Sequence, residues 1–258
     1  MTPLLEAQNL TVRFEGVVAL NGFSLAVNDR EILGIIGPNG SGKTTFFNTI
    51  SGFVKPDKGY ISFNRRKITH VSPHVIAELG IARTFQNLEL FPYMTVLQNV
   101  MVGNHSHVTT KDALKNIYSR DERQRQEFQA LEVLDFLGIS GFEHSRPAGL
   151  PFGIQKLVEL ARALVMQPKL LLLDEPAAGL NEQETMEMGR IIKDIRDDLR
   201  ITVLVVEHDM SLVMSISDRV VVLSSGETLT EGTPEEVKVN RDVVEVFLGS
   251  TYKENATA

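Results

Sequence analysis

Short runs of consecutive apolar residues recur along the chain, and some of the segments between them repeat apolar residues every third or fourth position. Three of these runs, ILGIIG (32–37), KLLLLD (169–174) and ITVLVVE (201–207), are typical of strands that are buried on both faces of a parallel sheet. Between the last two runs the apolar residues have the spacing of a helix, and they are Met188, Ile191, Ile192, Ile195 and Leu199. The alternation of buried strand and amphipathic helix predicts an α/β fold.

Two other patterns interrupt this alternation. LTVRF (10–14), FSLAV (23–27) and YISFN (60–64) alternate apolar with polar residues and are separated by Gly, Asn and Asp, which predicts a small antiparallel sheet. Residues 96–165 read as mostly helical, and the apolar positions expected on helices there include Leu114, Ile117, Phe128, Leu131, Leu134 and Leu137. Because we find no internal repeat and no long linker, we expect one domain that carries a helical insertion.

Composition and charge exclude several classes of protein. The chain has 258 residues, of which 43% are hydrophobic and 23% are charged, so it is long enough for a large core. Its net charge of -7 and its pI of 5.4 give no general attraction for a nucleic-acid backbone, and we expect no nucleic-acid partner. The absence of cysteine excludes disulfides and thiolate zinc sites.

The amino-terminal sequence, MTPLLEAQNL, lacks the basic start and the apolar run of a signal peptide, so we expect a cytoplasmic protein. No apolar run approaches the roughly 20 residues that cross a bilayer. If the protein acts at a membrane, we therefore expect partner proteins to connect it to the bilayer.

A glycine-rich stretch, GPNGSGKTT (37–45), follows the first apolar run and leads into TTFFNTIS, which reads as a helix. It matches G-x-x-x-x-G-K-[ST], a loop whose backbone N–H groups face phosphate oxygens. Lys43 would reach the β- and γ-phosphates, and Thr44 would supply a hydroxyl to Mg²⁺. The residues expected to contact nucleotide here are Gly37, Pro38, Asn39, Gly40, Ser41, Gly42, Lys43, Thr44 and Thr45. The alternative, a glycine-rich turn that binds nothing, is disfavoured by the strand and helix on either side.

LLLLDEP (170–176) supplies two carboxylates at the end of another expected strand. Asp174 would hold Mg²⁺ through water, and Glu175 would polarise the attacking water. Alone, the two carboxylates could equally be an acidic helix cap after a core strand. Paired with the phosphate loop, they predict an enzyme that hydrolyses a nucleoside triphosphate with Mg²⁺.

These two motifs and their order resemble those of the ATP-binding subunits of ABC transporters, and the resemblance extends over nearly the whole chain, through EGTPEEV at 231–237. It implies a P-loop NTPase core of the RecA-like kind, with a flanking antiparallel β subdomain and an inserted α-helical subdomain. Within this single nucleotide-binding domain, residues 1–87 and 168–258 are expected to form the ATP-binding core with the β subdomain, and residues 88–167 the helical subdomain. ATP and Mg²⁺ are the implied cofactors.

The resemblance also implies roles for residues outside the two motifs. Phe14 would stack on adenine, Gln86 in RTFQN would touch Mg²⁺ and the attacking water, and His208 in VVEHD would contact the γ-phosphate. Taken singly, each has an alternative: a core aromatic, an ordinary loop amide and a capped histidine. Gln86 and His208 join Lys43 and Glu175 as the expected catalytic residues.

LPFGIQ (150–155) stands where the family carries its LSGGQ signature, and AGLN, which ends at Asn181, stands where it carries the D-loop. In the family, the signature of one subunit contacts ATP on the phosphate loop of the other. The resemblance therefore implies head-to-tail dimers in which Gly153 contacts the partner's nucleotide. Pro151 and Phe152 replace the signature serine and the glycine after it, and Asn181 replaces an aspartate. These departures leave open a subunit that binds ATP without turning it over.

DEPAAGLN, VVEHDM and VVEVFLG are similar to segments of the ATPases that serve importers of branched-chain and other hydrophobic amino acids. Such ATPases act at the inner face of the cell membrane with permease subunits, a second ATPase that is a copy or a paralogue, and, indirectly, a substrate-binding protein. The segment 83–100 would dock on the permease through Leu88, Leu90, Phe91, Tyr93 and Met94, the alternative being that these residues pack within the helical insertion. A soluble, non-transport ABC ATPase that acts as a nucleotide-gated assembly factor is the alternative.

Overall fold

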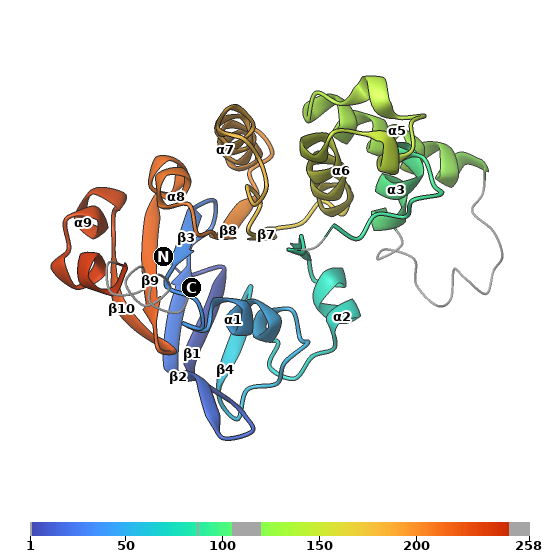
Figure 1. The fold of residues 1–258 in the computed structure, drawn as a ribbon. Helices are drawn as coiled ribbons and strands as arrows, with labels where there is room; N and C mark the ends of the chain where they lie inside the picture. Colours follow the sequence, from blue (N-terminus) through green and yellow to red (C-terminus); the bar gives the residue numbers. More distant parts are fainter. Residues whose placement is uncertain (1, 87, 105–119, 248–258) are drawn as a thin grey trace.

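The structure is a computed structural model that describes residues 2–86, 88–104 and 120–247. Its helices are α1 (Lys43–Ile50), α2 (Pro73–Glu78), α3 (Val96–Val102), α5 (Arg120–Phe136), α6 (Phe152–Leu164), α7 (Glu182–Asp197), α8 (Met210–Ile216) and α9 (Pro234–Lys238). Helices α3, α5 and α6 gather at one end of the molecule, beside the sheets (Figure 1). Leu114 and Ile117 lie outside the described residues. Within the described part of the chain, no helix is both long and apolar enough to cross a membrane.

The larger sheet has six strands in the order β10-β9-β3-β8-β7-β6. In chain order they are β3 (Ile32–Ile36), β6 (Ile81–Arg83), β7 (Leu170–Asp174), β8 (Thr202–Val206), β9 (Arg219–Ser224) and β10 (Glu227–Gly232). All pairs are parallel except that of β10 with β9. The three apolar runs are thus neighbouring strands, and the predicted α/β fold is confirmed.

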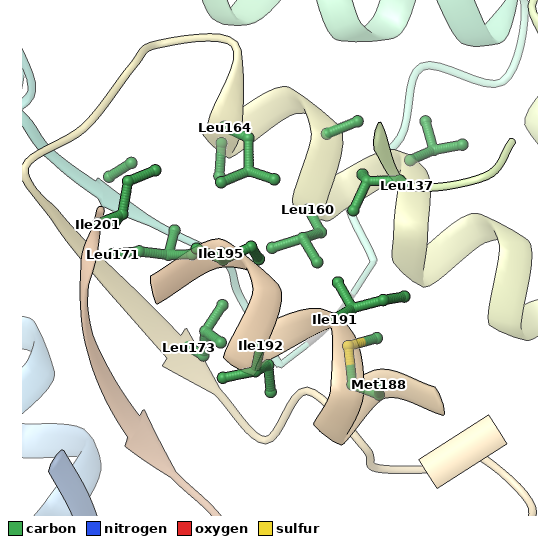
Figure 2. Close-up of a cluster of buried hydrophobic side chains, with 14 of the residues drawn as sticks. Leu137, Leu160, Leu164, Leu171, Leu173, Met188, Ile191, Ile192, Ile195 and Ile201 are labelled. Atoms are coloured by element: carbon green, nitrogen blue, oxygen red, sulfur yellow. The ribbon is translucent and has the colours of Figure 1, made fainter. Parts of the chain in front are cut away.

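The central strands are almost entirely apolar because both faces of this sheet are covered. Successive side chains of a strand point to opposite faces. In β7, Leu171 and Leu173 pack with α6 and α7, whereas Leu170 and Leu172 pack with α1 and the smaller sheet. Figure 2 shows the first of these cores, where Leu171 and Leu173 gather with Ile192 of α7. The sheet is therefore held between two hydrophobic layers.

The smaller sheet is antiparallel throughout, as predicted, in the order β2-β1-β4-β5. Its strands are β1 (Leu5–Phe14), β2 (Val17–Val27), β4 (Lys58–Phe63) and β5 (Arg66–Lys67). Phe23 of β2 meets Phe46 of α1 edge to face, with ring centroids 4.8 Å apart. Because α1 packs between the two sheets, the loop that precedes it has a fixed place in the fold.

Three residues expected on buried helix faces are exposed instead. On α5, Ala130 and Leu134 lie four residues apart and define the buried face. Phe128 and Leu131 lie off that face and are 61% and 38% exposed. Leu199 follows the end of α7 at Asp197, so it does not continue the buried stripe of that helix, and it is 41% exposed. The prediction was wrong for these three positions.

Candidate functional site

Four neighbouring parallel strands, β3, β8, β7 and β6, end at one edge of the larger sheet. Open sheets of this kind bind ligands at the carboxyl ends of their strands. The loops that leave these strands, together with the start of β2, enclose a cavity of about 400 Å³. Its lining residues are Val17, Val18, Ala19, Asn39, Gly40, Ser41, Gly42, Lys43, Thr44, Thr45, Gln86, Glu175 and His208. The structure thus brings most of the expected site residues together.

The loop before α1 has the shape of an anion cradle. Gly42 has a left-handed φ of 110°, and a Cβ there would lie 2.5 Å from the carbonyl oxygen of Ala19, so only glycine fits. The N-cap of α1 is Gly42, which has no side chain to cap the first turn, so the N–H groups of that turn can bind a ligand. The Ser41 hydroxyl is buried and has no hydrogen-bond partner in the described part of the chain. A phosphate in the cradle would satisfy both kinds of donor.

The amine of Lys43 points back over this loop. Nζ donates hydrogen bonds to the carbonyl oxygens of Gly37, at 2.7 Å, and Pro38, at 3.1 Å. Burial lowers the pKa of Lys43, although the carboxylates of Glu175 and Asp174 act against this shift. The amine is therefore held at the rim of the cradle, where phosphate oxygens can replace the two carbonyls.

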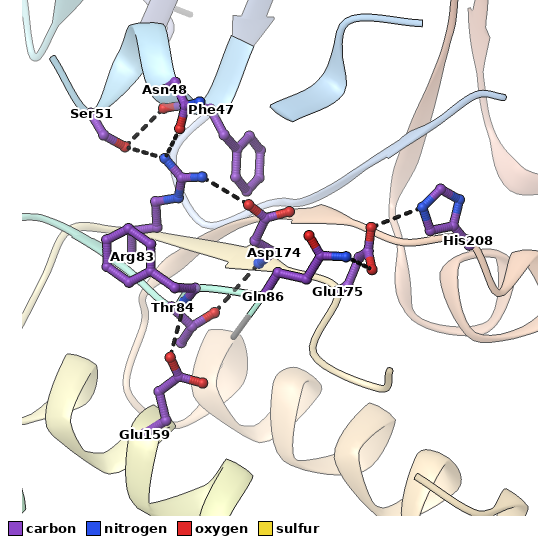
Figure 3. Close-up of polar contacts among 11 residues, drawn as sticks. Phe47, Asn48, Ser51, Arg83, Thr84, Gln86, Glu159, Asp174, Glu175 and His208 are labelled. Carbon is purple, nitrogen blue, oxygen red and sulfur yellow. Dashed lines mark hydrogen bonds and ion pairs between the residues drawn. The ribbon is translucent and has the colours of Figure 1, made fainter. Parts of the chain in front are cut away.

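The carboxylate of Glu175 is held from two sides (Figure 3). Gln86 Nε2 donates to Oε2 at 2.8 Å, and His208 Nε2 lies 2.8 Å from Oε1. The main chain of Glu175 is in the left-handed region, at φ 51°, which is uncommon for a residue with a side chain. Residues that follow three different strands therefore converge on one carboxylate.

Asp174 is paired with Arg83, a residue that the sequence motifs did not indicate. Arg83 Nη2 lies 2.8 Å from Asp174 Oδ2, and the two side chains are 8% and 5% exposed. Arg83 also donates to Asn48 Oδ1 at 2.8 Å, and its guanidinium lies 5.5 Å from the ring centroid of Phe47 and 5.1 Å from that of Phe85. The one sequence signal is a charged residue at the end of a short apolar stretch, and Arg83 is the last residue of β6. The guanidinium of Arg83 therefore compensates the negative charge of the buried Asp174 carboxylate through Oδ2.

Glu207, directly before His208, is a second residue that the motifs did not indicate. It is 3% exposed and accepts the N–H of Ala177 at 2.7 Å and that of His208 at 3.0 Å. Burial raises the pKa of Glu207, and these N–H groups act against the shift. Its carboxylate ties the loop that carries His208 to the loop that follows Glu175.

Four of the expected nucleotide contacts lie outside the lining of this cavity, and two of them, Gly37 and Pro38, belong to the phosphate loop itself. Phe14 ends β1 and is 46% exposed, so it is not a core aromatic. Gly153 lies in the first turn of α6, which Pro151 begins as its N-cap. The ring of Phe152, the first residue of the helix, is half-exposed. The cavity of this subunit therefore does not include its own signature sequence.

Asn181 has a structural reason to be an asparagine. Its side chain accepts the N–H of Glu184 at 3.0 Å, and the Glu184 carboxylate accepts the N–H of Asn181 at 3.0 Å. This reciprocal capping box begins α7. Replacing the family's aspartate by asparagine thus keeps a good helix cap.

The segment after Gln86 presents exposed apolar side chains, and they are Phe91, Tyr93 and Met94. Leu90 differs, because it packs partly against the core. The turn is built around the buried side chain of Asn99, whose Oδ1 accepts the N–H of Phe91 at 2.8 Å and whose Nδ2 donates to the Thr95 carbonyl at 2.9 Å. Hydrogen bonds therefore fix the backbone that displays these apolar groups.

A phosphate loop, a buried aspartate and a glutamate held by a glutamine and a histidine define the site as that of a P-loop ATPase. A family model described as "ABC transporter" matches residues 20–178. The chain belongs to the ABC transporter family, and it is an ATP-binding and ATP-hydrolysing cassette of that family.

The relatives of the chain match it over nearly its whole length. It is 41% identical over 251 residues to the high-affinity branched-chain amino acid transport ATP-binding protein BraF of Pseudomonas aeruginosa, covering 96% of this chain and 98% of that protein. It is 40% identical over 250 residues to the protein LivG of Escherichia coli, which has the same description, with the same two coverages of 96% and 98%.

Solved structures agree with the fold. The ADP conformation of MJ1267, an ATP-binding cassette of an ABC transporter, superposes with a TM-score of 0.85 at 32% identity, covering 96% of this chain and all 100% of that one. The dimeric cassette MJ0796 gives a TM-score of 0.77 at 26% identity over 89% of this chain and 98% of that one. The family resemblance expected from the motifs is confirmed.

Proposed function

We propose that this chain is the subunit that powers a membrane importer of branched-chain or other hydrophobic and neutral amino acids. The ATPase chemistry is supported by the convergence of Gln86 and His208 on Glu175 beside the phosphate loop. The amino-acid class is supported by relatives at 40–42% identity that are described as branched-chain amino acid transport ATP-binding proteins. These relatives favour the transport function over an assembly factor.

Within the site, the loop amides and Lys43 bind and neutralise the β- and γ-phosphates. Glu175 is the general base that activates the attacking water. Gln86 and His208 already hold the two oxygens of this carboxylate. We assign to Gln86 the orientation of that water and to His208 the contact with the γ-phosphate.

The same site suits Mg²⁺. Thr44, Gln86 and Asp174 offer oxygen ligands, which this ion prefers. No group of three or more His, Asp or Glu residues that could hold a metal is present among the residues the structure describes. The chain's own oxygens would therefore be supplemented by nucleotide phosphates, as is usual for this ion. Bound there, Mg²⁺ would neutralise the charge that develops on the phosphate oxygens.

The proposed active form is a head-to-tail pair of cassettes, in which the second subunit is a copy or a paralogue. Gly153 lies outside the cavity of its own subunit, which suits a residue that contacts the partner's ATP. We assign the stacking on adenine to Phe14, and its half-exposed ring at the end of β1 supports this role. The dimeric structure of the related cassette MJ0796 supports a pair of cassettes.

We place the cassette at the inner face of the membrane, bound to permease subunits that also engage a substrate-binding protein. The segment 83–100 is the proposed contact, since it joins Gln86 to the exposed Phe91, Tyr93 and Met94. In the proposed domain organisation, residues 1–87 and 168–258 bind ATP, and residues 88–167 form the helical subdomain that carries the signature.

Recovery with membrane proteins, combined with transport, tests this function. Tagged chain is captured from detergent-solubilised membranes, and leucine uptake is measured in cells whose only copy is wild type or Glu175→Gln. We expect both forms to retain integral permeases and only the wild type to support uptake. Tyr93→Ala should lose the permeases, whereas Phe128→Ala, which removes an exposed aromatic from α5, should keep them. Recovery without any integral membrane protein would contradict the proposal and favour an assembly factor.

A further inference from the structure

Helix α6, which begins at the signature sequence, buries two charged side chains. Lys156 and Glu159 are 4% and 3% exposed, and they lie three residues apart on one face of the helix. Lysine and glutamate are almost never fully buried unless they are paired. Each side chain forms a hydrogen bond with a main-chain atom of a loop of the ATP site.

Glu159 holds the loop that carries Gln86. Its Oε1 atom accepts the N–H of Phe85, the residue before Gln86, at 3.0 Å (Figure 3). Burial raises the pKa of Glu159, whereas this N–H and the cations Lys156 and Arg162 act against the shift. The main chain next to Gln86 is therefore anchored on α6.

Lys156 reaches the residue at the centre of the site. Its Nζ donates to the carbonyl oxygen of Glu175 at 3.2 Å, while the N–H of Glu175 donates to the Val206 carbonyl at 2.8 Å. The same Nζ lies 5.8 Å from the ring centroid of Phe152, in the signature. The Phe152 ring in turn covers Gly179, where a Cβ would lie 2.9 Å from it. Lys156 thus contacts both the signature and the catalytic loop.

We propose that Lys156 and Glu159 are positioning residues that fix Glu175 and Gln86 relative to the signature helix of the same subunit. This inference rests on the proposed function, because it concerns the geometry of that ATP site. Neither side chain is among the residues that line the cavity, so both act through the main chain of other residues. A misplacement of about 1 Å can lower an enzymatic rate about 10²-fold. A shift of α6 would therefore be felt at the subunit's own catalytic carboxylate.

The test compares four full-length variants with the wild type. Glu159→Ala removes the acceptor for the Phe85 N–H, and Glu159→Gln keeps one. Lys156→Met removes the donor to the Glu175 carbonyl and keeps the apolar stem. Leu160→Ala is the matched control, because Leu160 is the next residue of α6 and is equally buried in the core but makes neither contact. The readouts are kcat and KM for ATP, Tm, and hydrogen exchange of the Phe85 amide without nucleotide.

Glu159→Ala should speed exchange at Phe85 about tenfold, as expected for the loss of one hydrogen bond. It should lower kcat about tenfold and leave KM for ATP within about twofold, because the contact serves the reacting geometry and not binding. Lys156→Met should lower kcat to a similar extent without changing KM. Glu159→Gln should restore most of the turnover and the protection of Phe85. Leu160→Ala should lower Tm without either effect.

The inference is overturned if the Phe85 amide stays protected from exchange in Glu159→Ala. It is also overturned if the loss of kcat merely follows the loss of Tm in all variants, Leu160→Ala included. A wild type that hydrolyses ATP and loses this activity in Glu175→Gln upholds the ATPase part of the proposed function whatever the α6 variants do. In a chain whose wild type hydrolyses no ATP, the proposed function fails, and the exchange at Phe85 still decides whether Glu159 holds the loop.

Discussion

The buried ion pair between Arg83 and Asp174 gives a quantitative prediction for Arg83→Met. The two side chains are 2.8 Å apart and only 8% and 5% exposed, so solvent screens them little. Methionine keeps an apolar stem against Phe47 and Phe85, but it leaves the Asp174 carboxylate without its cation. Breaking a buried pair in this way costs about 3–5 kcal/mol. That is a large share of a typical free energy of unfolding, about 5–15 kcal/mol.

Urea unfolding of the nucleotide-free protein measures this loss as a lower midpoint with an unchanged slope. Adding Asp174→Asn to Arg83→Met removes the stranded charge, and it should recover about 2 kcal/mol or more. Arg190→Met is the matched control, because it breaks an ion pair with Glu187 whose side chains are 70% and 51% exposed. It should leave the midpoint unchanged.

A loss of unfolding free energy below about 1 kcal/mol in Arg83→Met would contradict this prediction, since an uncompensated buried charge should destabilise the fold by more. The prediction would also be wrong if the effects of Arg83→Met and Asp174→Asn add within about 0.5 kcal/mol, because residues in direct contact should be coupled.

Three further predictions concern single residues. Bound phosphates should raise the lowered pKa of Lys43, so ATP affinity should fall as pH rises toward 10.5. Calorimetry in buffers of different ionisation enthalpy should show proton uptake on binding, and an ATP affinity independent of pH would contradict this. Asn181→Ala should cost about 1 kcal/mol in thermal unfolding and Asn181→Asp almost nothing, and equal losses would argue against the capping box. Phe14→Ala should weaken nucleotide binding by about 1–3 kcal/mol in fluorescence titration, and unchanged affinity would remove the proposed stacking.

The sequence predicts an element well where the residues of that element alone show that it is buried. Strand β7 is apolar from Leu170 to Leu173 because helices and a second sheet cover both faces, and that burial is visible as an uninterrupted run. Leu199 and Phe128 show what apolar spacing alone cannot predict. Apolar spacing does not say where α7 ends or which side of α5 meets the core, because packing partners decide both.

The motif residues of the site were predictable because a phosphate loop and a carboxylate pair have fixed local spacing. Arg83, Glu207, Lys156 and Glu159 were not, because each is explained by a partner far away in the chain or by burial. Arg83 meets Asp174 across two neighbouring strands, and Glu159 meets Phe85 from another element. A charged residue in a helical pattern reads as solvent-facing until the tertiary structure shows what it touches.

The central claim is that two copies of this site are completed head to tail and that Glu175 activates the water. The most direct measurement is ATP hydrolysis by the purified chain, wild type beside Glu175→Gln, over a range of protein concentrations with dimers followed in the same samples. We predict turnover that rises more than linearly with concentration and falls roughly 10² to 10⁴-fold in the variant, while ATP-dependent dimers persist. Near-normal turnover in Glu175→Gln, or turnover proportional to concentration without dimers, would contradict the account.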